Sequence, residues 1–157
     1  IVANCIQGRS ENAYLIANFE SQVDVCRTNT APSTAFRAFG DVQSKLVLET
    51  AIDDAAFAIG MRPEDVREKN LYRLGDTTPF GQPLGDCYIR TVWDYLKQVS
   101  EFERQSTEAE AFNATNRWRK RAVAMLPVKY GSGYNLVNLE QAVATISICR
   151  LLRPKPS

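Results

Sequence analysis

The 157-residue chain contains no histidine, and its four cysteines lie far apart without a Cys-x-x-Cys pair. Structural zinc and iron–sulfur sites are built mainly from these two residue types. A metal site formed by this chain alone is therefore not expected. The lack of histidine also excludes Ser-His-Asp and Cys-His catalysis within these residues. We expect the cysteines to be free, buried and reduced thiols.

The chain also has no large excess of positive or negative charge and no long apolar run. Nineteen lysines and arginines face eighteen acids, so the net charge of +1 creates no field that attracts nucleic acid or an anionic membrane. No apolar run approaches the roughly 18 residues of a membrane span, and no signal-like region opens the chain. We expect a soluble, cytoplasmic protein with no nucleic-acid or membrane partner.

Four helices are predicted from apolar spacing and end signals. The first lies between Gly40 and Gly60, where apolar residues recur every three or four positions. A second begins at Pro63 and runs to about residue 70, since proline and acids suit a first helical turn. An apolar stripe over residues 89–99 predicts a third helix with Trp93 in the core, and residues 101–113 predict a fourth.

Short alternating runs predict strands at residues 12–19, 22–26, 121–126 and 142–149. The fold class expected is α+β, with several helices packed on short strands. Residues 1–157 are interpreted as a single partial domain, a piece of a longer chain that needs its neighbours to complete the sheet. The tail at 150–157 looks atypical or truncated.

The most informative segment is CRTNTAPSTAFRAFG at residues 26–40, which places Arg37 between Phe36 and Phe39. Proline, serine and threonine before this group, and glycine after it, predict irregular backbone, where binding groups are usually presented. Arginine could meet an anionic cofactor while a ring face meets a flat heterocycle. The alternative is a turn with two buried phenylalanines.

Two further segments widen the pattern: GDTTPFGQ at residues 75–82, and NRWRKR at 116–121 followed by MLPVKYG at 125–131. In this order and spacing, the three segments resemble the molybdenum-cofactor domain of the xanthine dehydrogenase and aldehyde oxidase family. The resemblance runs from about residue 12 to about residue 148. It implies a piece of the molybdopterin-binding domain of a molybdenum hydroxylase.

The resemblance also implies site residues. Arg37 stands where the family contacts the molybdenum–molybdopterin cofactor, and Phe39 matches the phenylalanine that stacks on the substrate ring, while Phe36 would give support. Tyr134 and Asn135 match a second aromatic residue and a small polar residue at the substrate, although the usual pair is phenylalanine and threonine. No residue here matches the family's catalytic glutamate.

Departures from the family pattern leave the substrate open. Cys5 stands where purine-oxidising members place an arginine that grips the substrate, and Arg9 is close by at a different spacing. Ala38 replaces a residue that is commonly glycine. The basic run at 117–121 could contact phosphate, but the family resemblance favours a structural strand entry. The acid pairs at 53–54 and 64–65 are interpreted as solvated helix positions.

The resulting hypothesis is a segment of a molybdenum hydroxylase that acts on purines, other N-heterocycles or aldehydes with water as the oxygen source. Iron–sulfur clusters, FAD and most cofactor contacts would belong to the rest of the same polypeptide, and the full-length protein would be a homodimer. The acceptor could be NAD or oxygen. The segment alone would be inactive. The alternatives are the aldehyde oxidase branch and a non-catalytic packing or interaction segment.

Overall fold

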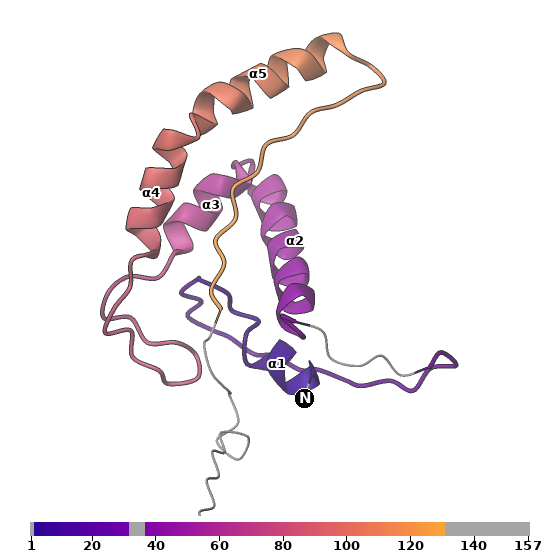
Figure 1. Ribbon diagram of the computed structural model, residues 1–157, viewed down its shortest axis with the longest axis vertical. Helices are drawn as coiled ribbons and strands as arrows, with labels where there is room; N and C mark the ends of the chain where they lie inside the picture. The colour runs from indigo at the N-terminus through magenta and orange to yellow at the C-terminus, as the bar shows by residue number, and fades with distance from the viewer. Residues whose placement is uncertain (1, 32–36, 131–157) are drawn as a thin grey trace, which may run out of the picture.

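The computed structural model describes residues 2–31 and 37–130, where five helices are joined by long irregular segments (Figure 1). These are α1 (Val2–Gln7), α2 (Asp41–Ile59), α3 (Pro63–Asn70), α4 (Ile89–Val99) and α5 (Phe102–Thr115). Figure 1 shows α2 and α3 near the centre, with α4 and α5 arching over one side. Residues 116–130 return from the end of α5 towards the region of α1.

The helix predicted between Gly40 and Gly60 is confirmed as α2. Its C-terminal glycine has φ of 67°, and the amides of Gly60 and Met61 donate to the carbonyls of Phe57 and Ala56 over 3.2 and 2.9 Å. This is the Schellman arrangement, which satisfies the last carbonyls of a helix and favours glycine at the left-handed position. The local sequence therefore fixes where α2 ends.

The other three helix predictions are confirmed as α3, α4 and α5. Pro63 occupies the first turn of α3 with Glu64 and Asp65, and basic residues occupy its last turn. Trp93 on α4 is buried, as predicted. Glu101, with φ of 50°, separates α4 from α5. α1 was not predicted.

The strand predictions for residues 12–19, 22–26 and 121–126 are wrong. Backbone pairing here consists of isolated bridges, Tyr14 with Leu71 and Thr77 with Pro83, among the residues described. An alternating pattern makes a strand only where a partner strand supplies hydrogen bonds, and no such partner runs beside these segments in the described structure. The predicted strand at 142–149 lies outside the described residues, so the α+β class is not confirmed.

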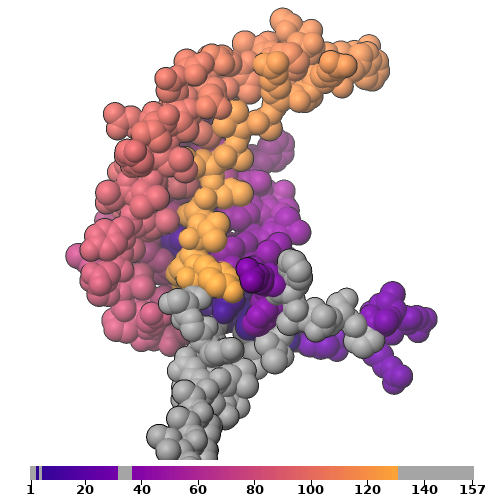
Figure 2. Space-filling view, in the orientation of Figure 1, coloured from indigo at the N-terminus to yellow at the C-terminus, as the bar shows by residue number. Residues whose placement is uncertain are grey.

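The core is assembled from segments far apart in the chain. Buried side chains of Tyr14, Leu71, Trp93, Phe102 and Met125 form one cluster together with Ala13. Leu48 and Ile52 of α2 pack against it. Figure 2 shows residues 116–130 lying between the α4–α5 arm and α2, which places Met125 in this cluster.

The thiols differ from the expectation in one respect. Cys5 is buried and Cys87 is half-buried, but Cys26 is exposed, because the segment before residue 32 extends away from the core. All three are free; Cys149 lies outside the described residues. In the part of the chain that is described, no helix is long and apolar enough to cross a membrane.

Candidate functional site

The turn at residues 37–40 carries the two candidate residues that the structure describes. Ala38 has φ of 61° and Gly40 has φ of 78°, so the chain twice adopts the left-handed conformation before it enters α2. The amide of Asp41 donates to the Ala38 carbonyl over 3.0 Å. Lys45 and Asp41 form an ion pair of 2.6 Å within the first turns of α2. The predicted irregular backbone is confirmed for residues 37–40.

Arg37 is exposed and Phe39 is half-buried on this turn. A guanidinium that reaches solvent from a hydrogen-bonded turn can donate to an anionic or polar group brought by a ligand. A half-buried ring keeps one face or edge accessible for contact. Their assignment to cofactor and substrate stays a prediction.

The other candidates cannot be placed. Tyr134 and Asn135 lie outside the described residues, as does Phe36. The last described residues before them are Lys129 and Tyr130, and the backbone of Lys129 is held by a buried polar network.

Asn12 is the centre of that network. It is fully buried with φ of 51°, and its side-chain amide donates to Glu49 and to the carbonyl of Pro127, both over 2.8 Å. Its side-chain oxygen accepts the amide of Lys129 over 3.0 Å. One asparagine therefore ties the segment after α1, helix α2 and residues 127–129 together.

Glu49 links the same network to α3. Its carboxylate accepts the Tyr14 hydroxyl at 2.9 Å and Arg67 Nε at 2.8 Å, and the second arm of Arg67 donates to Asp53 over 2.6 Å. Burial raises the pKa of the Tyr14 hydroxyl above its ordinary value, and the negative charge of Glu49 raises it further. Burial alone would lower the pKa of Arg67, but its bonds to Glu49 and Asp53 leave the pKa raised.

This network corrects the interpretation of the acid pairs. Asp53 holds Arg67 and is not merely solvated, while Glu64 is buried at the start of α3. Sequence reasoning missed the network because its members are separated by up to 117 residues.

The basic run does not form a strand. Arg117, Trp118 and Arg121 are exposed, with Arg117 over the Trp118 ring at 4.6 Å and Arg121 over the Phe112 ring at 4.0 Å. Arg117 and Arg121 therefore each form a cation–π contact with an aromatic ring close by in the sequence.

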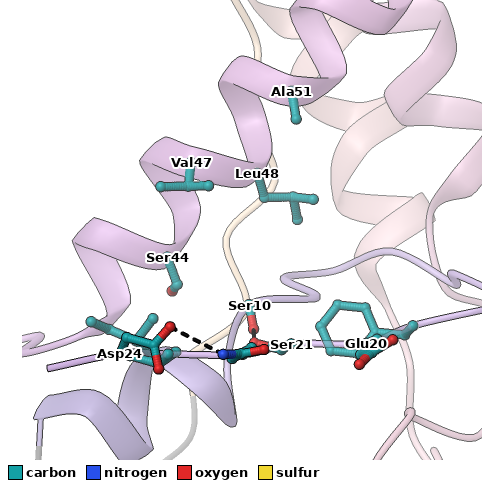
Figure 3. A pocket seen from close by; sticks show the side chains of 12 residues that line it. Ser10, Glu20, Ser21, Asp24, Ser44, Val47, Leu48 and Ala51 are labelled. Atoms are coloured by element: carbon teal, nitrogen blue, oxygen red, sulfur yellow. Dashed lines mark hydrogen bonds between the residues drawn. The ribbon is translucent and has the colours of Figure 1, made fainter.

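A pocket of about 470 Å³ lies between α2 and residues 19–24. Figure 3 shows Val47, Leu48 and Ala51 of α2 along one side, with Ser10 and Ser21 opposite. The two serines share a hydrogen bond of 3.1 Å. The described residues that line it include no cation and neither Arg37 nor Phe39, so this pocket offers little to a phosphate-bearing cofactor.

Comparison with known proteins agrees with the motifs. Residues 1–71 match the family described as the molybdopterin cofactor-binding domain. The chain is 35% identical over 140 residues to the nicotinate hydroxylase of Emericella nidulans, and 36% over 138 residues to the xanthine dehydrogenase/oxidase of Mus musculus. It is 38% identical over 138 residues to aldehyde oxidase 2 of Cavia porcellus. Each match covers 88% of this chain and 10% of the relative.

The chain thus spans about a tenth of the length of these curated relatives. Among solved structures, the aldehyde oxidoreductase of Desulfovibrio gigas is 34% identical and covers 49% of this chain and 8% of its own. Its TM-score of 0.44 is too low to support a fold assignment. The sequence matches and the family-specific segments together show that the chain belongs to the xanthine dehydrogenase and aldehyde oxidase family, within its molybdenum-cofactor-binding part.

Proposed function

We propose that this chain is part of a molybdenum hydroxylase that oxidatively hydroxylates purines or other N-heterocycles, with water as the oxygen source. The observation that carries the proposal is the match over 88% of the chain to xanthine dehydrogenases and to a nicotinate hydroxylase. The rest of the same polypeptide would hold iron–sulfur clusters and FAD and would decide between NAD and oxygen as acceptor. The whole enzyme would be a cytoplasmic homodimer.

Arg37 would contact the molybdenum–molybdopterin cofactor, which supplies the oxidising metal centre when bound. The residue suits this role because its side chain is exposed and its turn is fixed by hydrogen bonds to α2. Guanidinium groups donate strongly to phosphate and to polar heterocycles. The chain supplies binding and orientation here, and the redox chemistry belongs to the cofactor.

Phe39 would hold the substrate by stacking, with Tyr134 as a second ring and Asn135 as a hydrogen-bond partner. Stacking fixes the plane of a flat ring and leaves its edge free to react. The half-buried state of Phe39 supports this role, since a packed ring keeps its orientation while one part stays accessible.

The aldehyde oxidase branch is the second candidate. It is favoured by the 38% identity to aldehyde oxidase 2 of Cavia porcellus, a value similar to those of the xanthine-oxidising relatives. Cys5, in place of the substrate-gripping arginine expected from the resemblance, favours the same branch.

The test uses the full-length protein that contains this chain. Molybdenum content and steady-state rates with xanthine, nicotinate and an aromatic aldehyde are measured for wild type, Arg37→Ala and Phe39→Ala. Loss of a charge-assisted hydrogen bond predicts about tenfold weaker cofactor retention for Arg37→Ala. Loss of stacking predicts a roughly two- to tenfold lower kcat/KM for ring substrates in Phe39→Ala at normal molybdenum content.

Arg104→Ala, an exposed arginine on α5, is the matched control and should change neither quantity. If Arg37→Ala and Phe39→Ala lower only thermal stability and leave activity per molybdenum unchanged, the chain is a packing segment. Wild-type protein that contains no molybdenum would exclude the hydroxylase.

A further inference from the structure

A second pocket, of about 400 Å³, also borders the segment that follows α1. Arg9 and Glu11 line it from that segment, Thr78, Phe80 and Gln82 from the loop between α3 and α4, and Lys129 from the end of the described chain. Figure 1 shows the end of the described chain, in orange, close to the indigo segment that follows α1. We name these residues the Arg9 pocket.

Arg9 is the unusual group in this pocket. Arg9 is only 7% exposed, and its Nε and Nη1 atoms are buried without a hydrogen-bond partner among the residues described. The guanidinium carbon lies 4.9 Å from the centre of the Tyr130 ring. The Tyr130 ring contacts the face of the guanidinium. The N–H groups lie in the plane of the guanidinium, so this contact does not give them a hydrogen-bond acceptor. A buried cation in this state needs an acceptor.

The neighbouring charges do not provide one. Lys129 Nζ is paired with Glu11 Oε1, and Glu11 is 1% exposed, so these two charges cancel each other. Lys129 also lies 5.4 Å from the centre of the Tyr72 ring. Arg9, Glu11 and Lys129 together leave one positive charge, and that charge is on Arg9.

The other walls show the kind of anion that fits. Thr78 Oγ1 accepts the amide of Gln82 over 3.1 Å, which leaves its own O–H available as a donor. Phe80 adds an apolar wall and is held by the Phe19 ring, edge to face, with 6.0 Å between ring centres. The net charge of one positive unit is neutralised by a single carboxylate, whereas a dianion such as phosphate would leave excess negative charge beside Glu11 Oε2, which has no hydrogen-bond partner among the described residues.

We propose that the Arg9 pocket binds a carboxylate, which Arg9 holds, with the apolar part of the ligand against Phe80. The carboxylate comes either from a small molecule or from an aspartate or glutamate of the longer protein. This site does not rest on the proposed hydroxylase function, because occupancy is measured by binding without turnover.

The test is calorimetric titration of benzoate into the full-length protein and its Arg9→Met variant. Met keeps the length of the side chain and removes the charge. Benzoate should bind the wild type and bind Arg9→Met at least tenfold more weakly. Benzamide, which has the same shape without charge, and inorganic phosphate should bind the wild type at least tenfold more weakly than benzoate. Arg104→Met, at an exposed site on α5, should bind benzoate like the wild type.

Thermal unfolding without ligand separates the two sources. If the protein's own carboxylate fills the pocket, benzoate does not bind and Arg9→Met lowers Tm, because a buried carboxylate loses its cation. If the pocket is empty until a small molecule binds, Arg9→Met raises Tm or leaves it unchanged, since an unpaired buried charge is removed.

Two results would overturn the site. One is equal benzoate affinity in wild type and Arg9→Met, or equal affinity of the wild type for benzoate and benzamide. The other is no benzoate binding together with a Tm of Arg9→Met that equals or exceeds that of the wild type.

Discussion

At the scale of single residues, Ala38 holds a conformation that its side chain opposes. Its φ of 61° is left-handed, and the next residue but one, Gly40, is left-handed as well. A side chain in this region costs roughly 1–2 kcal/mol per residue, because Cβ approaches the following carbonyl. The turn that presents Arg37 therefore contains local strain that glycine would remove.

We expect Ala38→Gly to stabilise the protein. Relief of the left-handed strain exceeds the extra entropy that glycine adds to the unfolded chain, so the free energy of unfolding should rise by roughly 0.5–1 kcal/mol. The measurement is the urea midpoint of the full-length protein. Ala58→Gly, in the helical and exposed part of α2, is the control and should cost about 1 kcal/mol. A lower midpoint for Ala38→Gly would show that the turn is not strained.

At the scale of elements, the contact between α2 and α3 depends on a buried ion pair. Glu49 accepts hydrogen bonds from Asn12, Tyr14 and Arg67, all of which are buried. Removal of one partner from such a pair leaves an uncompensated charge inside the protein. Asn12, which donates to Glu49, also donates to the Pro127 carbonyl and accepts the Lys129 amide, so loss of Glu49 should disturb residues 127–129 as well.

We predict that Glu49→Ala lowers the free energy of unfolding by roughly 3–5 kcal/mol. Asp54→Ala, five residues further on the exposed side of α2, should change it by less than about 0.5 kcal/mol. Urea denaturation measures both. Amide hydrogen exchange at residues 128–130 should also become faster in Glu49→Ala alone. Equal stability of the two variants would refute the role of the network.

Helices α3 and α4 meet through Glu68, which gives a pH-dependent contact. Its carboxylate accepts Lys97 Nζ over 3.1 Å and Trp93 Nε1 over 3.2 Å. The hydrogen bond from Lys97 lowers the pKa of Glu68, the Trp93 bond lowers it further, and burial opposes both. A carboxyl group with a pKa lowered by folding stabilises the protein above its unfolded pKa, and that stabilisation is lost as the pH falls through the folded pKa.

We therefore expect Glu68→Gln to be less stable than the wild type at pH 7, with the difference shrinking once the pH falls below the unfolded pKa of about 4.3. Urea midpoints at pH 7, 5, 4 and 3.5 test this dependence. Glu110→Gln is the control, because Glu110 is exposed on α5 and makes no ion pair among the described residues. A constant difference across this pH range would exclude the carboxylate as its source.

The elements differ in how far the sequence predicted them. α2 and α3 were predictable because local sequence signals mark their ends. Gly60 marks the C-terminal end of α2, and Pro63 marks the N-terminal end of α3. The strands failed because pairing depends on a partner elsewhere in the chain, and alternation cannot identify one. The turn with Arg37 and Phe39 was predicted as irregular from its proline and glycine. The hydrogen bond from Asn12 to Pro127, 115 residues apart, had no local signal.

At the scale of the whole molecule, the described surface is rich in apolar side chains. α2 exposes Leu46, Val47, Phe57 and Ile59, and α4 exposes a further set, Val92, Tyr95, Leu96 and Val99. Phe57 is 90% exposed. Contiguous apolar surface on helices usually marks an interface. The chain spans about a tenth of the length of its relatives. We therefore expect other segments of a longer protein to cover these helix faces.

Phe57 provides the test of that expectation. If another segment covers it, its substitution should harm the longer protein and improve the solubility of the isolated chain. In the longer protein, Phe57→Lys should lower stability by roughly 1.5–3 kcal/mol, the value of a buried phenylalanine, because a charge would enter an apolar contact. In the isolated 157-residue chain, the same substitution should reduce binding of a hydrophobic dye and raise solubility. Thr107→Lys, at an exposed polar position of α5, should do neither. If Phe57→Lys leaves the longer protein as stable as Thr107→Lys does, this face of α2 is open to solvent in the whole molecule.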